Sequence, residues 1–253
     1  MKKIIALMIC ALMLLSACGG TSANSGTAQK PVLVMGTNAE FPPFEFIGET
    51  GLVENYDGID VAIAMQIAED HGYTLEISNM EFDGLLAALS QGKIDFIAAG
   101  MSVTDERKEN ADASVEYYLA AQNIIVMGDD DSVTSGADLT DKTIGVQEGT
   151  TGDIICSDDM GLDVTRYKKG ADAVMALKKG DVDAVVIDTA PAASFVKKNS
   201  DLKLITDAEF FGEEAYAIWV KKGNTELLDR INQTLTKMLN DGSIDKLSVE
   251  YSE

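Results

Sequence analysis

The chain has 253 residues, of which 42 are acidic and 20 are basic, so its formal net charge at pH 7 is −22. A protein with this negative charge repels nucleic acid and anionic lipid headgroups, which argues against either as a partner. The length suits one large domain or two modest lobes that each bury a core, and we favour two lobes.

Residues 1–18 have the layout of an export signal. Two lysines are followed by an apolar run from Ile4 to Leu15, which is shorter than the roughly 20 residues that a membrane-spanning helix needs. The ending Leu15-Ser16-Ala17-Cys18 resembles the bacterial lipobox, in which the cysteine is lipidated and the chain is cut just before it. We therefore expect an extracytoplasmic protein anchored to the cell membrane by lipid at Cys18, with an ordinary cleaved signal as the alternative.

Residues 19–30 lack large apolar side chains and predict a flexible tether, so folding should start near Pro31. Cys10 would leave with the signal and Cys18 would carry lipid. Cys156 then remains as a free thiol, and no internal disulfide is expected.

From Pro31 onward, short β-branched runs alternate with helical patterns, which is typical of an α/β fold with mostly parallel sheets flanked by helices. The predicted strands are Val32–Thr37, Thr74–Met80, Ile94–Ala99, Ile144–Val146, Val164–Tyr167, Ala184–Ile187 and Leu202–Ile205. Apolar residues at three and four spacing predict helices at Ile59–Asp70, Phe82–Gln91, Ala171–Lys179 and Thr225–Asn240.

A weak internal repeat supports two lobes of similar build. Ala88–Asp95 in the first half matches Ala176–Asp183 in the second, and both read as a helix end, a glycine and then a strand. In open parallel sheets, ligands bind beyond the carboxyl ends of the strands, where Ala99–Ser102 and Ile187–Asp188 would lie. The alternative is that this helix–glycine–strand pattern, which is common in α/β proteins, occurs twice by chance.

The first candidate site follows the strand that ends at Ala99. Gly100 would let a ligand approach the backbone, and the chain then passes Ser102 and enters a helix that carries Arg107. The planar guanidinium of Arg107 can bind a carboxylate through two parallel hydrogen bonds. The alternative is a surface arginine that pairs with an acidic neighbour on its own helix.

The second candidate site lies in the other half of the chain. Gln147, Thr150 and Thr151 surround a predicted helix start, where free backbone N–H groups favour an anion. Asp188 ends an apolar strand, so its carboxylate needs a cation such as a ligand ammonium, unless it only caps the next helix.

Two aromatic residues complete the candidate set. Phe41 follows the first strand and Phe82 follows the second, so both could pack on a ligand side chain. Apolar core is their ordinary alternative.

With these residues in place, the chain resembles the family 3 solute-binding proteins, which are receptors of polar amino-acid ABC importers. The segments that carry the resemblance are GTNAEFPPFEF from Gly36, GIDVAIAMQIAEDHG from Gly58, MEFDGLLAALSQGKIDFIAAGMSVTDER from Met80, IGVQEGTTG from Ile144 and DAVVIDTAPA from Asp183. They span nearly the whole mature chain, and together they are specific.

The resemblance implies a two-lobe fold of the type II periplasmic-binding-protein kind, with two crossing hinge strands near Ala120–Asn123 and Phe210–Ala215. Lobe 1 would comprise residues 31–120 plus 214–253, and lobe 2 residues 121–213. By analogy, Arg107 and N–H groups at Ser102 and Thr151 hold the ligand carboxylate. Asp188, the Gly100 carbonyl and the Ser102 hydroxyl hold its ammonium.

Departures from known receptors bear on the ligand. Asn38 stands where the glutamine and lysine/arginine receptors have aspartate, Ile187 replaces a histidine, and Gln147 replaces the lysine of the glutamine receptor. These changes argue against a strict glutamine receptor. Glu40 could supply a negative charge for a lysine or arginine side chain, or it could point to solvent.

A receptor of this kind is not an enzyme and needs no cofactor or metal. Its expected partners are a free amino acid, an ABC permease with its ATPase subunits, and the membrane through the lipid anchor, with the receptor itself a monomer. One rival is a cyclohexadienyl dehydratase on the same fold, for which Glu148 would be the acid. The other is a ligand-sensing module of a signalling receptor.

Overall fold

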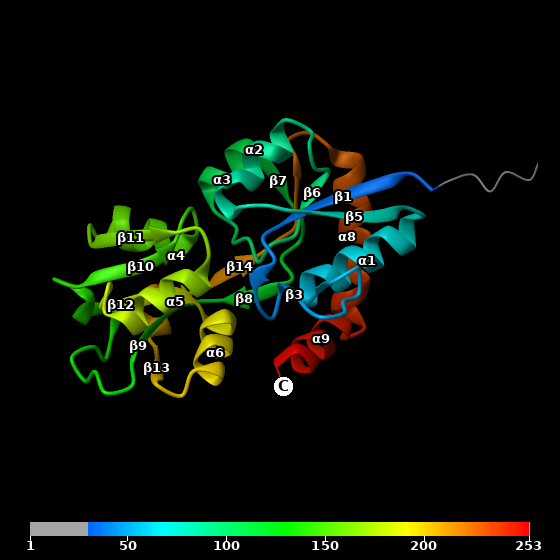
Figure 1. Cartoon of the computed structure of the whole chain (residues 1–253). Coiled ribbons are helices and arrows are strands. Elements are labelled where there is room, and N and C mark those ends of the chain that lie inside the picture. Colours follow the sequence, from blue (N-terminus) through cyan, green and yellow to red (C-terminus); the bar gives the residue numbers. More distant parts are fainter. Residues whose placement is uncertain (1–29, 253) are drawn as a thin grey trace, which may run out of the picture.

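The computed structural model describes residues 30–252 of the chain (Figure 1). The signal predicted at 1–18, its lipidation site Cys18 and nearly all of the tether predicted at 19–30 lie outside these residues. The described chain forms two lobes that lie side by side and are joined by a pair of strands (Figure 1). Among residues 30–252, no helix has the length and apolar character needed to cross a bilayer.

The first lobe is built on a five-stranded sheet. Its strand order is β5 (Thr74–Asn79), β1 (Val32–Thr37), β6 (Phe96–Ile97), β15 (Trp219–Lys221) and β7 (Ala111–Ala113). β1 pairs in parallel with β5 and β6, whereas β15 is antiparallel to both β6 and β7. β15 is therefore the one strand of this sheet that runs against the others.

Helices cover both faces of this sheet. α1 (Ile59–His71) and α8 (Thr225–Asn240) share a core with Leu33 and Met35 of β1, and α9 (Ser243–Ser252) packs against both helices. The turn η1 (Phe82–Gly84) and α2 (Leu85–Ser90) share the opposite core with Val34 and Trp219. Alternate residues of β1 thus serve opposite cores, as the two-residue period of a strand requires.

The second lobe repeats this plan. Its strand order is β11 (Asp163–Tyr167), β10 (Thr143–Gln147), β12 (Ala184–Asp188), β9 (Gln122–Met127) and β13 (Leu202–Thr206). β10 is parallel to β11 and β12, and β9 is antiparallel to β12 and β13. Each sheet is therefore mixed and contains one reversed strand.

The helices of the second lobe also divide between two faces. One core contains α5 (Gly170–Lys179) and α6 (Thr189–Lys198). The opposite core contains residues of η2 (Gly136–Leu139) and of the π-helical turn η3 (Ile155–Asp159), which follows α4 (Thr151–Ile154), with α7 (Ala208–Phe211) packed against it. Cys156 lies in η3, where its free thiol is buried.

The two lobes are joined by β8 (Tyr118–Ala120) and β14 (Glu214–Tyr216), which pair antiparallel to each other. β8 leads into β9 and β14 leads into β15, so each crossing strand feeds the reversed strand of the lobe that it enters. Tyr216 is fully buried and packs against the rings of Phe44 and Tyr118, at centroid distances of 5.0 and 5.7 Å. Aromatic packing therefore supports the junction from the first-lobe side.

The predicted repeat is present in three dimensions. α2 leads to β6, and α5 leads to β12, through Gly92 and Gly180, which have left-handed φ angles of 70° and 79°. In both units the aspartate that follows accepts a hydrogen bond from a strand N–H: Asp95 from Val34 (2.7 Å) and Asp183 from Thr143 (2.8 Å). The sequence repeat thus marks the same structural unit in each lobe.

Several elements differ from their predicted bounds. The helix predicted at Phe82–Gln91 is divided into η1 and α2, and the strand predicted at Ile94–Ala99 is shortened to β6. The crossing segments were predicted near Ala120–Asn123 and Phe210–Ala215, whereas the crossing strands are β8 and β14. The predicted ranges extend too far, since Gln122 already begins β9 and Phe210 belongs to α7. A small sheet of β2 (Glu40–Phe41), β3 (Glu45–Ile47) and β4 (Tyr56–Asp57) was absent from the prediction.

Candidate functional site

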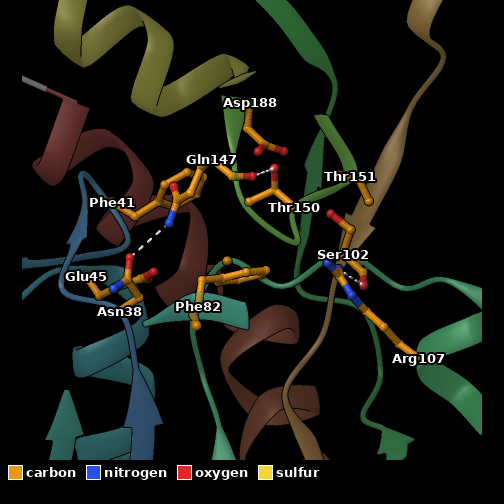
Figure 2. A pocket seen from close by; sticks show the side chains of 12 residues that line it. Asn38, Phe41, Glu45, Phe82, Ser102, Arg107, Gln147, Thr150, Thr151 and Asp188 are labelled. Carbon is orange, nitrogen blue, oxygen red and sulfur yellow. Dashed lines mark hydrogen bonds between the residues drawn. The ribbon is translucent and has the colours of Figure 1, made fainter. Parts of the chain in front are cut away.

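A pocket lies between the two lobes (Figure 2). Its lining residues come from the carboxyl ends of β1, β6, β10 and β12, from the segments that follow these strands and β5, and from the small sheet: Asn38, Phe41, Glu45, Phe82, Ala99, Gly100, Ser102, Arg107, Gln147, Thr150, Thr151 and Asp188. Eleven of the twelve were proposed from the sequence, and the exception is Glu45. The structure thus brings together residues up to 150 positions apart in the chain.

Arg107 is placed in this pocket by α3 (Asp105–Asn110). Thr104 caps the helix and accepts a hydrogen bond from the Arg107 N–H at 3.2 Å. The side chain turns inward: Nη1 donates to the Ser102 carbonyl at 2.8 Å and Nη2 to the Gly149 carbonyl of the other lobe at 3.0 Å. Arg107 is buried and lies 5.5 Å from the Phe82 ring centroid, so it is not the surface arginine of the alternative reading.

Gly100 allows the backbone to pass close to Phe41. Its φ is 52°, and a Cβ atom at this position would lie 2.9 Å from the Phe41 ring. Its N–H donates to the buried carboxylate of Asp60 at 2.8 Å, and the Tyr117 hydroxyl donates to the same carboxylate. Burial raises the pKa of Asp60 to about 6, although both hydrogen bonds oppose the rise. Asp60 thus fixes the Gly100 segment from beneath the pocket.

Asp188 ends β12 and occupies the position just before α6, but its side chain makes no capping hydrogen bond. The carboxylate instead accepts a hydrogen bond from Gln122 Nε2 at 3.0 Å and lines the pocket. Burial, followed by the negative charge of Glu214, raises its pKa to about 7. A cation beside Asp188 would relieve this destabilisation of the charged form.

Thr150 and Thr151 lie at the start of α4. The Thr150 hydroxyl donates to the Gln147 carbonyl at 2.8 Å and accepts from the Asp153 N–H at 3.3 Å, so it caps the helix. Gly149 has a φ of 78° and its position lies against Asp83 of the first lobe, where a Cβ atom would be 3.2 Å from Asp83 Cβ. The helix start is therefore held close to the opposite lobe.

Asn38 and Gln147 connect the lobes inside the pocket (Figure 2). Gln147 Nε2 donates to Asn38 Oδ1 at 3.0 Å, and Asn38 Nδ2 donates to the Met80 carbonyl at 2.8 Å. Both side chains are buried. Phe41 and Phe82 are also almost fully buried, yet both line the pocket and contribute apolar surface to it.

Glu45 is the pocket residue that the sequence reasoning missed. Its side chain is 0% exposed and lies beside the Asp60 carboxyl group, and no lysine or arginine among the described residues forms an ion pair with it. Burial, followed by the negative charge of Asp60, raises the pKa of Glu45 well above its usual value. β2 pairs with β3 so that Phe41 lies opposite Glu45, and this cross-strand pairing, which the spacing of the sequence does not reveal, brings Glu45 to the pocket.

Residues 33–253 match the family of bacterial extracellular solute-binding proteins, family 3. The chain belongs to this family. It is 33% identical over 258 residues to the arginine-binding extracellular protein ArtP of Bacillus subtilis, with 99% of this chain and 98% of that protein covered. A probable histidine-binding protein of Neisseria gonorrhoeae is 32% identical over 261 residues, with coverage of 99% and 96%.

Solved structures agree with this membership. The arginine-bound form of truncated ArgBP from T. maritima has a TM-score of 0.77 and is 44% identical, over 82% of this chain and 96% of that chain. The two-lobe α/β fold of this family 3 protein is thereby confirmed. It is an extracytoplasmic amino-acid binding protein of an ABC importer and not an enzyme, as the sequence indicated.

Three residues considered from the sequence do not line the pocket of this solute-binding protein. Glu40 forms an ion pair of 2.7 Å with Lys169 across the two lobes, and Ile187 is buried in the core of the second lobe. Glu148, the acid of the dehydratase alternative, pairs with Lys168 at 2.8 Å and is 37% exposed. Lys168 also reaches Asp83 of the first lobe at 2.8 Å. The outer rim of the pocket is thus closed by ion pairs.

Proposed function

We propose that this receptor binds a free L-amino acid with a positively charged side chain, and that L-arginine is its preferred ligand. One observation carries the proposal: Glu45 is a fully buried carboxyl group beside a second acidic group, Asp60, it has no paired cation among the described residues, and it lines the same pocket as Arg107 and Asp188. A buried carboxylate needs a paired cation or several donors, and a guanidinium offers both.

The α-amino-acid group would bind between the lobes. Arg107, with N–H groups at Ser102 and Thr151, would hold the carboxylate, while Asp188, the Gly100 carbonyl and the Ser102 hydroxyl would hold the ammonium. Arg107 and Asp188 line the pocket from different lobes, so a zwitterion that contacts both favours the closed arrangement. Closure then follows from tighter binding to one conformation.

The ligand side chain would run between Phe41 and Phe82 toward Glu45. In Figure 2, Glu45 and Asn38 lie to the left of Phe82, and Arg107 lies to its right. Asn38 and Gln147 would add hydrogen-bonding groups beside Glu45. The names of the relatives support a cationic ligand, since ArtP and ArgBP are described as arginine-binding proteins.

Delivery would take place at the cell membrane. The signal-like segment that ends at Cys18 supports lipid anchoring there, and the family supports an ABC permease with its ATPase subunits as the partner of the monomeric receptor. The anchor would hold the receptor close to the permease. Binding, closure and handover then make up the whole function, with no chemical step.

Calorimetry with arginine and citrulline tests the ligand assignment, because citrulline keeps the shape of arginine without its charge. Glu45→Gln should weaken arginine binding by about 10- to 150-fold, as expected for loss of a hydrogen-bonded charge worth about 1.5–3 kcal/mol, and should change citrulline binding less. Glu40→Gln is the matched control, which loses only the exposed ion pair with Lys169, so it should reduce the affinities for arginine and citrulline equally and by no more than about fivefold. Equal losses for arginine and citrulline in Glu45→Gln would contradict the proposal.

A further inference from the structure

Behind the pocket, one amide joins three acceptors. Gln122 Nε2 lies 3.0 Å from Asp188 Oδ1, 2.6 Å from Glu214 Oε1 and 3.1 Å from Thr151 Oγ1. An amide nitrogen carries two protons, so it cannot serve all three at once, and the two carboxylates are its stronger acceptors. Thr151 can use its own hydroxyl proton, and Gln122 is then committed to Asp188 and Glu214.

Glu214 does not line the pocket, but it belongs to the crossing strand β14. Its Oε2 atom is buried and has no hydrogen-bond partner among the described residues. The Glu214 charge acts on both principal ligand-binding groups: it raises the pKa of Asp188 and opposes the burial-driven decrease in the pKa of Arg107. Glu214 is thus a second negative charge at the subsite assigned to the ligand ammonium.

We infer that Glu214 is a positioning residue of the ammonium subsite, which orients the Asp188 carboxylate through Gln122 and places a second negative charge beside it. The inference rests on the ammonium-binding role of Asp188 proposed above. Through Glu214, the crossing strand β14 contributes to ligand recognition in addition to the residues that line the pocket.

The network belongs to one side of the hinge. Gln122, Thr151 and Asp188 lie on β9, α4 and β12 of the second lobe, and Glu214 lies on the strand that leaves this lobe. Opening of the lobes therefore does not have to break it. The titratable groups that act on Asp188 or are acted on by it are Glu214 and Tyr216 on β14, Arg107 on α3 and Glu45 on β3.

These other groups do not substitute for Glu214. Arg107 brings a positive charge, which favours ionised Asp188, and Tyr216 is neutral because burial and the Asp188 charge raise its pKa well above the usual value. Burial and the negative charge of Asp60 raise the pKa of Glu45 well above its usual value, which disfavours a negative charge on this group. Glu214 is accordingly the largest charge effect on Asp188.

The test is a ¹³C NMR titration of the Asp188 carboxyl in the ligand-free protein, with the signal assigned by its loss in Asp188→Asn. Glu214→Gln should lower the midpoint by about 1 pH unit, the size expected for loss of a nearby like charge. Glu213→Gln, an exposed change of the same charge on the adjacent residue, should leave it unchanged. Gln122→Leu should raise the midpoint, because it removes a donor to the charged form of Asp188.

The opposite directions separate this role from a merely structural one. Added water at a loosened site would lower the midpoint in both Glu214→Gln and Gln122→Leu, and that result would overturn the inference, as would an unchanged midpoint in Glu214→Gln. Arginine affinity measured in a Glu45→Gln background, where Asp188 is the linked carboxyl, gives the functional readout: between pH 8 and pH 6 it should fall about tenfold with Glu214 present and about twofold in Glu214→Gln. Undiminished binding by Asp188→Asn would instead refute the proposed function.

Discussion

The pH dependence of ligand binding follows from the burial of Asp188. Its pKa in the empty pocket is raised to about 7, mainly by burial, whereas an ammonium in contact with it would lower that pKa strongly. Binding at pH 6 must therefore release a proton. With a pKa of 7, Asp188 contributes about 0.9 proton at pH 6 and about 0.1 at pH 8.

A rise in pH has opposite effects on the stability of the ligand-free protein and on its affinity for the ligand. Raised carboxyl pKa values at Asp188 and Asp60 mean that the empty folded state binds more protons than the unfolded chain between pH 4 and 7, so its free energy of unfolding falls as pH rises through this range. Ligand affinity rises over the same range. From pH 6 to pH 8 the Asp188 effect amounts to about tenfold, or about 1.4 kcal/mol.

Calorimetry in buffers with different ionisation enthalpies measures the released protons directly. Glu45 has a raised pKa too and would add to the proton release when a guanidinium binds, so the Glu45→Gln variant isolates the Asp188 contribution. A proton count near zero at pH 6 in both proteins, together with constant affinity from pH 6 to pH 8, would refute the assignment of the ammonium to Asp188.

Three further predictions concern Arg107 in the pocket, the Lys169–Glu40 ion pair at its rim, and the lipid anchor at Cys18. Arg107→Ala should weaken amino-acid binding by at least 2–5 kcal/mol in calorimetry while circular dichroism shows a folded protein, and undiminished affinity would exclude Arg107 from the site. Lys169→Ala removes the exposed ion pair with Glu40 across the lobes, so it should reduce affinity by no more than about fivefold and weaken the salt dependence of binding; an unchanged salt dependence would contradict the role of this pair in closure. Cys18→Ser should release the receptor from the cell membrane and abolish incorporation of labelled palmitate, and retention of the label would place the anchor elsewhere.

The fold was largely predictable because its signals are local. Gly92 and Gly180 end helices in left-handed conformations, and the β-branched runs between helices become strands of parallel pairs. The small sheet at residues 40–57 was not predictable in the same way, since its strands have two or three residues and offer no measurable period. The division of residues 82–91 into a 3₁₀ turn and a helix is likewise set by packing.

In the candidate site, too, some features could be predicted from the sequence and others depend on the fold. Arg107 and Asp188 were each ambiguous from spacing, and only the fold shows that one turns inward from α3 and that the other makes no capping hydrogen bond. Glu45 was missed because it is flanked in the sequence by Phe44 and Phe46 and begins a strand of only three residues. Its place in the pocket depends on the pairing of β3 with Phe41 of β2, which sequence spacing alone does not reveal.

A thermal-shift screen of the wild-type protein against the twenty amino acids plus ornithine, citrulline and cystine tests the central claim most directly. A ligand present at 100 times its Kd stabilises the folded state by about 2.7 kcal/mol, so the preferred ligand should stand out. At pH 8 we expect the largest increase in Tm with L-arginine, a smaller one with other cationic amino acids and little with citrulline. No increase with arginine, or a larger one with an uncharged amino acid, would contradict the account.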